Sequence, residues 1–267
     1  MGDVHQPFRP AHRERLPFLQ IDRGTLRVSG HALVLDTENA QLDLPAGGVS
    51  ALWLGPGVSV THAAVALCAQ MDTLLLWVGE EGVRLYAASR PRASDGHRVL
   101  RQAELRLRPR SRIAVARRLY AHMLGSTPPA KAIETLRGLE GAYVRRRYAE
   151  LAAANGLIWE SRERAPRSLK DGLAYASAAL YGICESVILT AGYHPAIGFI
   201  HTGDPRSFVF DLADTVKFTT VAPWMFEAYS ESGLADPRTQ ARRIVRDRSR
   251  QSGLVGSLFE ILNTVMD

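Results

Sequence analysis

The sequence predicts an α+β fold in which a small β-rich part precedes a larger helical part. Apolar residues recur with a period of two between residues 17 and 88, and with the helical period from residue 97 onward. A polar, turn-rich break over residues 90–96 separates the two patterns. We therefore expect a β-rich domain over residues 1–90 and an α-helical domain over residues 91–267.

Short strands joined by turns account for the first domain. Residues 25–28 and 32–35 flank Ser29-Gly30-His31, which is typical of a hairpin connection. Thr61 is a suitable N-cap for a short helix over residues 63–71. No catalytic constellation is found in this part, so chemistry is expected in the second domain. The remaining expected strands are 41–44, 49–54, 74–78 and 83–86.

The second domain is expected to be helical throughout. Segment 172–191 is nearly all small or apolar and is followed by Gly192, which predicts a buried central helix with a glycine cap. Asp236-Pro237 offers an N-cap and a first helical residue to the last stretch, which breaks near Ser252-Gly253. The expected helices are 97–108, 110–124, 129–155, 172–191, 207–218, 222–231 and 238–266.

Composition excludes several classes of protein. With 46% apolar residues in 267, the chain can build a substantial core and is not generally disordered. There is no apolar run of membrane-spanning length, and the polar N-terminus lacks a signal-peptide core. Cys68 and Cys184 both lie in apolar helical patterns, which are typical of buried thiols. We therefore expect a cytoplasmic protein with no membrane partner, disulfide or zinc site.

The basic residues are dominated by arginine. The net charge is +6, and 30 of the 33 basic residues are arginine. A GC-rich genome explains this ratio through codon usage, whereas phosphate recognition explains it because a guanidinium group binds two phosphate oxygens at once. Clustering favours phosphate recognition: eight arginines fall within residues 98–118, three within 145–147 and five within 242–250.

The candidate chemistry centres on Glu140, His201 and Asp214, with Asp211 one helical turn before Asp214. Glu140 lies between two glycines on an expected amphipathic helix. It is either a solvated surface charge or a point where a nucleic-acid backbone approaches closely, because glycines leave room for one. His201, in Gly-Phe-Ile-His-Thr-Gly, is structural or catalytic. The two aspartates repel one another, cap the helix or share a cation.

Carboxylates combined with an imidazole suit Mg²⁺ or Mn²⁺. Such an ion can polarise a phosphoryl oxygen and activate a water or a 3′-hydroxyl. Inside an arginine-rich domain, this ligand set indicates phosphodiester chemistry on nucleic acid. No Ser/His/Asp arrangement and no phosphate-binding glycine loop competes with it.

Several segments together resemble one known family. They are Leu-Glu-Gly at 139–141, Leu-Tyr-Gly at 180–182, Ala-Gly-Tyr-His-Pro-Ala-Ile-Gly-Phe-Ile-His-Thr-Gly at 191–203, Ser-Phe-Val-Phe-Asp-Leu-Ala-Asp-Thr-Val-Lys-Phe at 207–218, and residues 59–65 and 73–86. The family is the CRISPR adaptation integrase, the first-numbered CRISPR-associated protein, and the likeness is greatest to its type I-E branch. It spans most of the chain.

The resemblance implies a fold, an activity and partners. The fold is an N-terminal β-sandwich, through which the protein forms a homodimer, followed by an all-helical catalytic domain. The activity is that of a metal-dependent DNA endonuclease and integrase, which inserts captured foreign DNA into a CRISPR array by 3′-hydroxyl attack on a phosphodiester. Mg²⁺ or Mn²⁺ is expected on Glu140, His201 and Asp214, with Asp211 as a further acidic catalytic residue. A small second-numbered CRISPR-associated subunit completes the complex on double-stranded DNA.

Expected DNA contacts follow from the charge pattern and the resemblance together. They are Arg84, Arg145, Arg146, Arg147, Tyr181, Lys217, Arg242, Arg243 and Arg246. The sequence departs from the family where Ser59 and Ala66 replace basic residues and where Ile21 stands near the position of an aromatic DNA wedge. How the ends of the DNA are separated is therefore not indicated.

Two other functions remain open. The chain could be a DNA-binding architectural subunit whose acidic site is not catalytic, or a metal hydrolase for small phosphorylated or carbonyl substrates. The intact set Glu140, His201 and Asp214 favours the integrase over the first alternative. Arginines spread over several helices, rather than around one pocket, disfavour the second.

Overall fold

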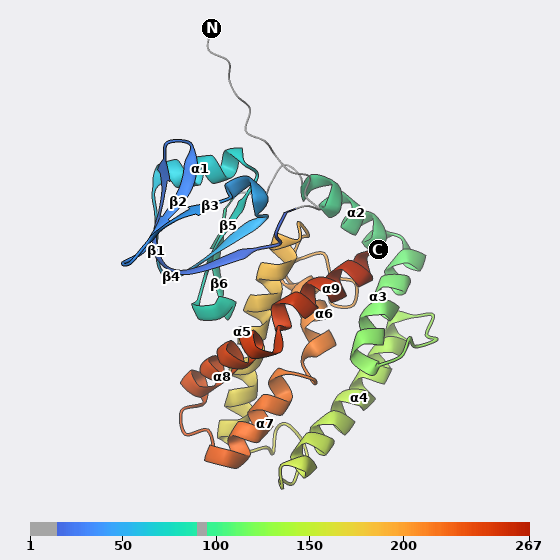
Figure 1. Cartoon of the computed structure of the whole chain (residues 1–267). Helices are drawn as coiled ribbons and strands as arrows, with labels where there is room; N and C mark the ends of the chain where they lie inside the picture. Colours follow the sequence, from blue (N-terminus) through green and yellow to red (C-terminus); the bar gives the residue numbers. More distant parts are fainter. Residues whose placement is uncertain (1–14, 90–94) are drawn as a thin grey trace. The chain divides into compact units, whose positions relative to one another are not determined.

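The structure is a computed structural model that describes residues 15–89 and 95–267. Along these residues six strands precede a series of helices, which confirms the predicted mixed α+β fold (Figure 1). The chain divides into a first compact unit, Met1–Val99 with Leu189–Tyr193, and a second, Leu100–Ile188 with His194–Asp267. The expected boundary after residue 90 falls on residues outside the described part and stays a prediction.

All the described strands belong to one hydrogen-bonded sheet, in the order β3-β2-β1-β4-β5-β6. Strand β1 pairs antiparallel with β2 and parallel with β4, and β5 pairs parallel with β4. The sandwich implied by the family resemblance therefore takes the form of a single continuous sheet in this structure. The strands are β1 (Leu19–Ser29), β2 (Ala32–Asp36), β3 (Gln41–Leu44), β4 (Ala51–Val60), β5 (Leu74–Val78) and β6 (Leu85–Ala88).

The predicted hairpin joins β1 to β2. Ser29 pairs with Ala32, and Gly30 in the two-residue loop between them has a φ of 60°. Gly24, within β1, has a φ of 127°, and a Cβ there would come within 2.6 Å of the Asp36 carbonyl oxygen. Only glycine fits this position, because L-residues rarely adopt such a φ and the neighbouring backbone leaves no room.

One helix, α1 (His62–Gln70), packs against the sheet and completes the core of the first unit. Its predicted N-cap is confirmed, since the Thr61 side chain accepts a hydrogen bond from the Ala64 N–H. Cys68 is fully buried in this core, and burial raises the pKa of its thiol to about 12. Ile21, at the position of the family's aromatic wedge, is also a core residue and is 4% exposed.

The first unit also contains a short segment from much later in the chain, Leu189–Tyr193. The buried Trp53 indole donates from Nε1 to Thr190 Oγ1 at 3.0 Å, and Arg98 donates to the Ala191 carbonyl. Gly192 has a φ of 79°, and a Cβ there would lie 2.5 Å from Asp95 Oδ1. The glycine predicted to end the long central helix is therefore required by both conformation and space.

The second unit consists of helices connected by loops. Gly253, with a φ of 65°, separates the last two helices, and Asp236 caps the first of these through the Thr239 N–H, as predicted. The helices are α2 (Gly96–Leu107), whose first turn falls in the first unit, α3 (Pro109–Leu124), α4 (Ile133–Ala154), α5 (Arg167–Thr190), α6 (Ser207–Val216), α7 (Val221–Ser232), α8 (Pro237–Ser252) and α9 (Leu254–Met266).

Helix α5 corrects the bounds expected for the central helix, because it begins at Arg167 rather than at residue 172. By length and composition alone, this helix is also long and apolar enough to cross a membrane. However, 67% of its most apolar 18-residue window is buried inside the protein. Its apolar character therefore matches the predicted role of a buried central helix.

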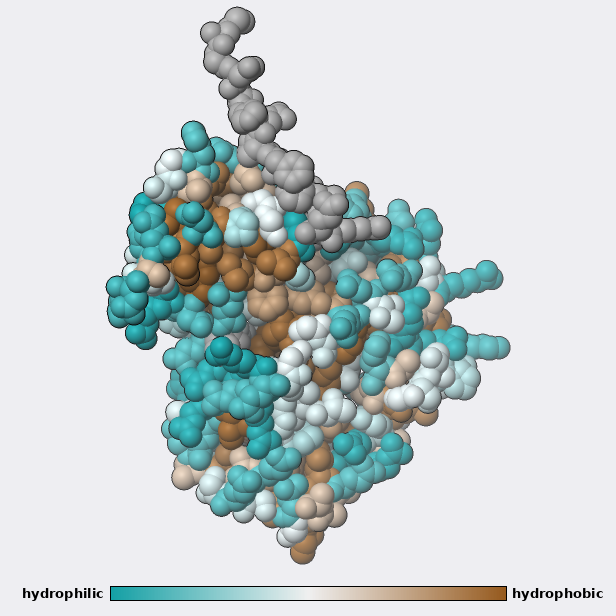
Figure 2. Space-filling model, in the orientation of Figure 1, coloured by the Kyte–Doolittle hydropathy of each residue, from teal (hydrophilic) through white to brown (hydrophobic). Residues whose placement is uncertain are grey.

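The visible surface is mostly hydrophilic, with an apolar area over the strands of the first unit (Figure 2). Large apolar side chains of this unit that are exposed include Leu16, Leu42 and Tyr86. Such a surface is typical of a site of protein association.

Candidate active site

The loop between α5 and α6 carries His201, and the carboxylate of Asp211 on α6 holds this loop in place. Asp211 accepts backbone hydrogen bonds from Phe199 at 2.5 Å, Ile200 at 3.1 Å and His201 at 2.9 Å. Its side chain is fully buried. Three convergent N–H donors take the place of water around this carboxylate and make its burial tolerable.

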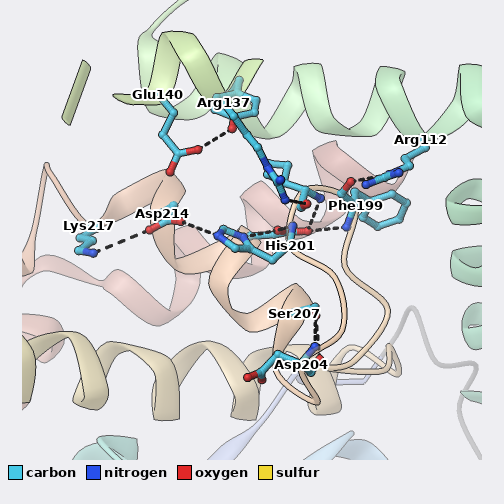
Figure 3. Close-up of polar contacts among 12 residues, drawn as sticks. Arg112, Arg137, Glu140, Phe199, His201, Asp204, Ser207, Asp214 and Lys217 are labelled. Atoms are coloured by element: carbon cyan, nitrogen blue, oxygen red, sulfur yellow. Dashed lines mark hydrogen bonds and ion pairs between the residues drawn. The ribbon is translucent and has the colours of Figure 1, made fainter. Parts of the chain in front are cut away.

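Two arginines hold the same loop through its carbonyl groups. Arg112 on α3 donates from Nε to the Phe199 oxygen at 2.7 Å, and Arg137 on α4 donates to the Ile200 oxygen at 2.8 Å (Figure 3). Burial lowers the pKa of Arg112, although this group remains a cation under ordinary conditions. The loop backbone is therefore fixed on both its N–H and its C=O groups.

The His201 ring has one nitrogen committed to the protein and one directed toward a cleft. Nδ1 lies 2.8 Å from Asp211 Oδ1. An ionised carboxylate only accepts hydrogen bonds, so Nδ1 donates and Nε2 keeps its lone pair in the neutral ring. Nε2 lies 3.9 Å from Asp214 Oδ2. The bond to Asp211 raises the pKa of His201, and burial opposes this effect.

Asp214 follows Asp211 by one turn of α6 and faces the cleft with its side chain 23% exposed. Burial raises its pKa to about 6, and the negative charges of Glu140 and Asp211 add to the increase. Lys217, whose Nζ lies 4.0 Å from Asp214 Oδ1, acts in the opposite direction together with His201. The site thus concentrates negative charge that one lysine partly offsets.

Glu140, on α4, completes the set. Its side chain points toward Asp214 in Figure 3. The hydroxyl of Tyr120 on α3 donates to Glu140 Oε2 at 2.6 Å. Burial, followed by this bond to Glu140, raises the pKa of Tyr120 well above its usual value, so the hydroxyl stays protonated. The predicted trio, far apart in sequence, is therefore brought to one place.

A cleft of about 810 Å³ in the second unit is lined by all three predicted metal-binding residues. Asp211 does not line it and instead lies at a small cavity behind Glu140, His201 and Asp214. The cleft wall combines aromatic rings with cationic groups, which suits a nucleic acid. The lining residues are Met123, Glu140, Val144, Arg145, Tyr148, Ala149, Trp159, Glu160, Ser161, Arg162, Glu163, Tyr181, His201, Arg206, Phe210, Asp214, Lys217 and Phe218.

The expected metal ion can be tested against these side chains. Among residues 15–89 and 95–267, no three His, Cys, Asp or Glu side chains are grouped closely enough to hold an ion as they stand. However, the 3.9 Å between His201 Nε2 and Asp214 Oδ2 fits two donors of one ion. With metal–ligand bonds of about 2.1 Å, such donors lie at most about 4.2 Å apart. Burial is the main cause of the raised pKa of Asp214, and a cation would offset it and relieve the added repulsion from Glu140 and Asp211. The chemistry of the donors therefore fits such an ion: His201 and Asp214 are at a suitable spacing, and Glu140 lines the same cleft as a third oxygen donor.

The predicted DNA-binding residues fall into separate groups. Arg145, Tyr181 and Lys217 line the cleft with the acidic residues. Tyr181 packs edge-on against Phe210 with ring centroids 5.0 Å apart, and burial raises its pKa to about 12. These positions are brought together with the site. Arg242, Arg243 and Arg246 lie elsewhere, on α8, and Arg84 lies in the first unit before β6.

The arginine triplet on α4 is divided by the geometry of the helix. Arg146 is exposed and pairs with Glu150 at 3.4 Å. Arg147 donates to Glu150 at 2.6 Å and to the Phe218 carbonyl at 3.2 Å, and its Nε is buried. Arg147 is thus committed to contacts within the protein, which favours a structural role over the predicted phosphate contact.

Sequence reasoning missed several residues of the site. Tyr120 looks like an ordinary core residue of an amphipathic helix, and no local pattern pairs it with Glu140. Arg206 lies over the Phe210 ring at 5.3 Å and lines the cleft, and Arg162 lines it from the loop after α4. The density of arginine in this half of the chain was the available signal, but it does not single out these two.

The fold and the site define a class: mixed α+β proteins whose helical part carries a Glu/His/Asp set in an arginine-bordered cleft. The family profile of CRISPR associated protein Cas1 matches residues 19–125 and 120–238. The chain therefore belongs to the Cas1 family.

Individual relatives are similar over nearly the whole chain. The CRISPR-associated endonuclease Cas1 of Geobacter sulfurreducens is 41% identical over 269 residues, covering 97% of this chain and 88% of the relative. That of Escherichia coli K12 is 39% identical over 262 residues, covering 95% and 86%. The crystal structure of a TtCas1–DNA complex is 31% identical, with a TM-score of 0.84 over 96% of this chain and 98% of that one.

Proposed function

We propose that this protein is a CRISPR nuclease and integrase of the type I-E branch that inserts captured foreign DNA into a CRISPR array. The observation that carries the proposal is the convergence of Glu140, His201 and Asp214 on one cleft with cationic walls. The relatives named as CRISPR-associated endonucleases, including that of Escherichia coli, support it. So does the solved TtCas1–DNA complex.

The reaction is a transesterification. The 3′-hydroxyl oxygen of the captured fragment forms a bond to a phosphorus atom of the array, and the bond from that phosphorus to the array's 3′-oxygen breaks. One phosphodiester is thus exchanged for another, and the proton of the attacking hydroxyl ends on the leaving oxygen after exchange with solvent. No oxidant or energy source is needed.

In this proposal, Glu140, His201 and Asp214 hold Mg²⁺ or Mn²⁺, which when bound would polarise the phosphate and favour an ionised hydroxyl. Asp211 keeps the Nε2 lone pair of His201 directed to the cleft, because Nδ1 is occupied. Lys217 lies beside Asp214. Arg145, Arg206 and Lys217 contribute positive charge to the cleft wall, where phosphate groups of the DNA are expected to bind.

The remaining parts of the proposal concern assembly. We propose a homodimer formed through the first unit, and its exposed apolar side chains such as Leu42 and Tyr86 support association there. A complex with the small second-numbered CRISPR-associated subunit on double-stranded DNA, in the cytoplasm, belongs to the same proposal. Arg84 and the α8 arginines are proposed to contact DNA away from the cleft.

One observation favours a second candidate, a DNA-binding architectural subunit with a non-catalytic acidic site. In the described part of the chain, the acidic and imidazole groups do not stand close enough to hold an ion without adjustment. The two candidates make different predictions for Asp214. The integrase needs Asp214 to join DNA, whereas the architectural subunit binds DNA without joining it.

The deciding experiment replaces Asp214 with asparagine, which keeps its shape and removes its charge. We expect Asp214→Asn to reduce Mn²⁺-dependent joining of a DNA fragment to a repeat by at least about 100-fold, the effect typical of losing one electrostatic stabiliser of a transition state. DNA affinity should stay within a few fold, and EDTA should stop joining by the unaltered protein. Asp171→Asn, at an exposed carboxylate paired with Arg167, is the control. Equal joining by Asp214→Asn and the control would remove Asp214 from the metal site. DNA binding without joining, even by the unaltered protein with Mn²⁺, would favour the architectural subunit.

A further inference from the structure

The environment of Glu140 differs from that of the other two acidic groups. Asp211 is held by three backbone N–H groups, and Asp214 has Lys217 and His201 beside it. For Glu140, the hydrogen bond that the described structure shows is from the Tyr120 hydroxyl, at 2.6 Å. The orientation of its carboxylate therefore depends on Tyr120, a residue that no local sequence pattern links to the site.

Tyr120 is well placed to fix this carboxylate. It is 2% exposed, on the buried face of α3, so its ring cannot swing away without disturbing the core. Its ring lies at the small cavity behind the cleft, where Glu140, His201, Asp211 and Asp214 also lie. The hydroxyl donates to Oε2 of Glu140, which lines the cleft, whereas Tyr120 does not line it.

The flexibility of a glutamate makes such support useful. Glu140 is half-buried and its side chain has several rotatable bonds. Without a hydrogen-bond partner, its carboxylate would therefore sample many rotamers. A ligand that is already oriented loses less conformational entropy when it binds an ion. A hydrogen-bond partner of a metal-binding carboxylate typically changes metal affinity by about 10- to 100-fold when it is removed.

We propose that Tyr120 is a positioning residue for Glu140, holding Oε2 so that the other carboxylate oxygen faces Asp214 and His201 across the cleft. Tyr120 itself touches neither the ion nor the DNA. This inference rests on the proposed function, because it gives Glu140 the role of a metal ligand.

The alternative is that the hydrogen bond only joins α3 to α4. Tyr120→Phe distinguishes the two roles, because it removes one oxygen and keeps the ring that fills the core. Its matched control is Ser177→Ala, which removes another buried hydroxyl, bonded within α5 to the Leu173 carbonyl. Both variants are made in the full chain.

Three measurements are needed. Mn²⁺ affinity of the protein without DNA is measured from the electron paramagnetic resonance signal of free Mn²⁺. The joining rate is followed as a function of Mn²⁺ concentration, and the thermal unfolding midpoint is recorded. We expect Tyr120→Phe to weaken Mn²⁺ binding about tenfold, with the joining rate largely restored at high Mn²⁺. Its unfolding midpoint should match that of Ser177→Ala within a few degrees.

The outcomes separate this inference from the proposed function. If Glu140→Gln weakens Mn²⁺ binding and Tyr120→Phe leaves it unchanged, the positioning role is wrong and the metal site stands. If Glu140→Gln also leaves Mn²⁺ affinity unchanged, both the metal role of Glu140 and the inference fail. A lowered unfolding midpoint with unchanged Mn²⁺ affinity assigns the hydrogen bond to helix packing alone.

Discussion

A single buried carboxylate, that of Asp211, organises the site at the scale of residues. It binds the N–H groups of Phe199, Ile200 and His201 and the Nδ1 of the His201 ring. Because a carboxylate accepts hydrogen bonds, its contact with Nδ1 also determines which His201 nitrogen carries the proton. One side chain thus sets the loop conformation, the ring orientation and the tautomer.

Replacing Asp211 with asparagine tests this role. The amide would direct an NH₂ group toward backbone donors, leaving at least one buried N–H without an acceptor. We expect the free energy of unfolding to fall by roughly 1.5–3 kcal/mol, the usual value for a lost hydrogen bond to a charged group. Urea denaturation measures the change, with the exposed Asp171→Asn as a control expected to stay within about 0.5 kcal/mol. An unchanged urea midpoint for Asp211→Asn would contradict the organising role.

The sequence could predict Asp211 and Asp214 as site residues, but not which of them is buried and which faces the cleft. Asp211 and Asp214 were expected to share a face of one helix, and they do lie on neighbouring positions of α6. Positions three apart differ by about 60° around a helix. That angle is enough to bury Asp211 completely and leave Asp214 partly exposed at the cleft. Which of the two turns inward depends on the loop packed against α6, and no local pattern encodes it.

At the scale of elements, the helices were predictable because their signals are local. The cap at Asp236 and the break at Gly253 were predicted and confirmed. The pairing of α3 with α4 was not predictable, because Tyr120 meets Glu140 only through tertiary packing. Arg147 shows the same limit: the triplet predicted a basic face, whereas the structure turns this arginine toward the Phe218 carbonyl.

Helix α8 is the most basic element outside the cleft. Arg242, Arg243 and Arg246 lie on it at least partly exposed, while Arg248 pairs with Glu227 on α7. Ala241, Val245 and Ser249 form its buried face. An amphipathic helix with arginines along its outer side is suited to phosphate groups, and it is equally compatible with simple solvation.

Salt dependence separates these two interpretations of α8. If all three arginines contact phosphates, Arg242→Gln, Arg243→Gln and Arg246→Gln together should weaken DNA binding. They should also reduce the slope of log affinity against log salt by about 0.9 per lost contact, or roughly 3 in total. Fluorescence anisotropy over a salt series measures this. The triple lysine variant keeps the charge and should retain most of the slope. A slope unchanged in the glutamine variant would assign these arginines to solvent.

At the scale of the whole molecule, the chain returns to its first unit long after leaving it. Trp53 and Thr190 are 137 residues apart in sequence, and Arg98 and Ala191 are 93 apart. A sequence boundary drawn where the hydrophobic period changes cannot detect this return, because Leu189–Thr190 continue the apolar pattern of α5. The hydrogen bond from Trp53 is the contact that can be tested most cleanly, because both partners are buried.

Thr190→Val tests whether that bond holds the returning segment in the first unit. Valine fills the same volume and leaves the buried Trp53 N–H without its acceptor. This should cost about 1–3 kcal/mol. If this cost lowers the free energy of local opening, amide exchange in the opened segment should accelerate roughly 5- to 150-fold. Hydrogen exchange with mass spectrometry should show the acceleration in β4, β5 and residues 189–193, but not in α7 or α8. Thr264→Val, which removes an exposed hydroxyl bonded within α9, should change nothing. If exchange accelerates equally in both units, the chain opens as one cooperative body, and the segment's assignment to the first unit has no energetic meaning.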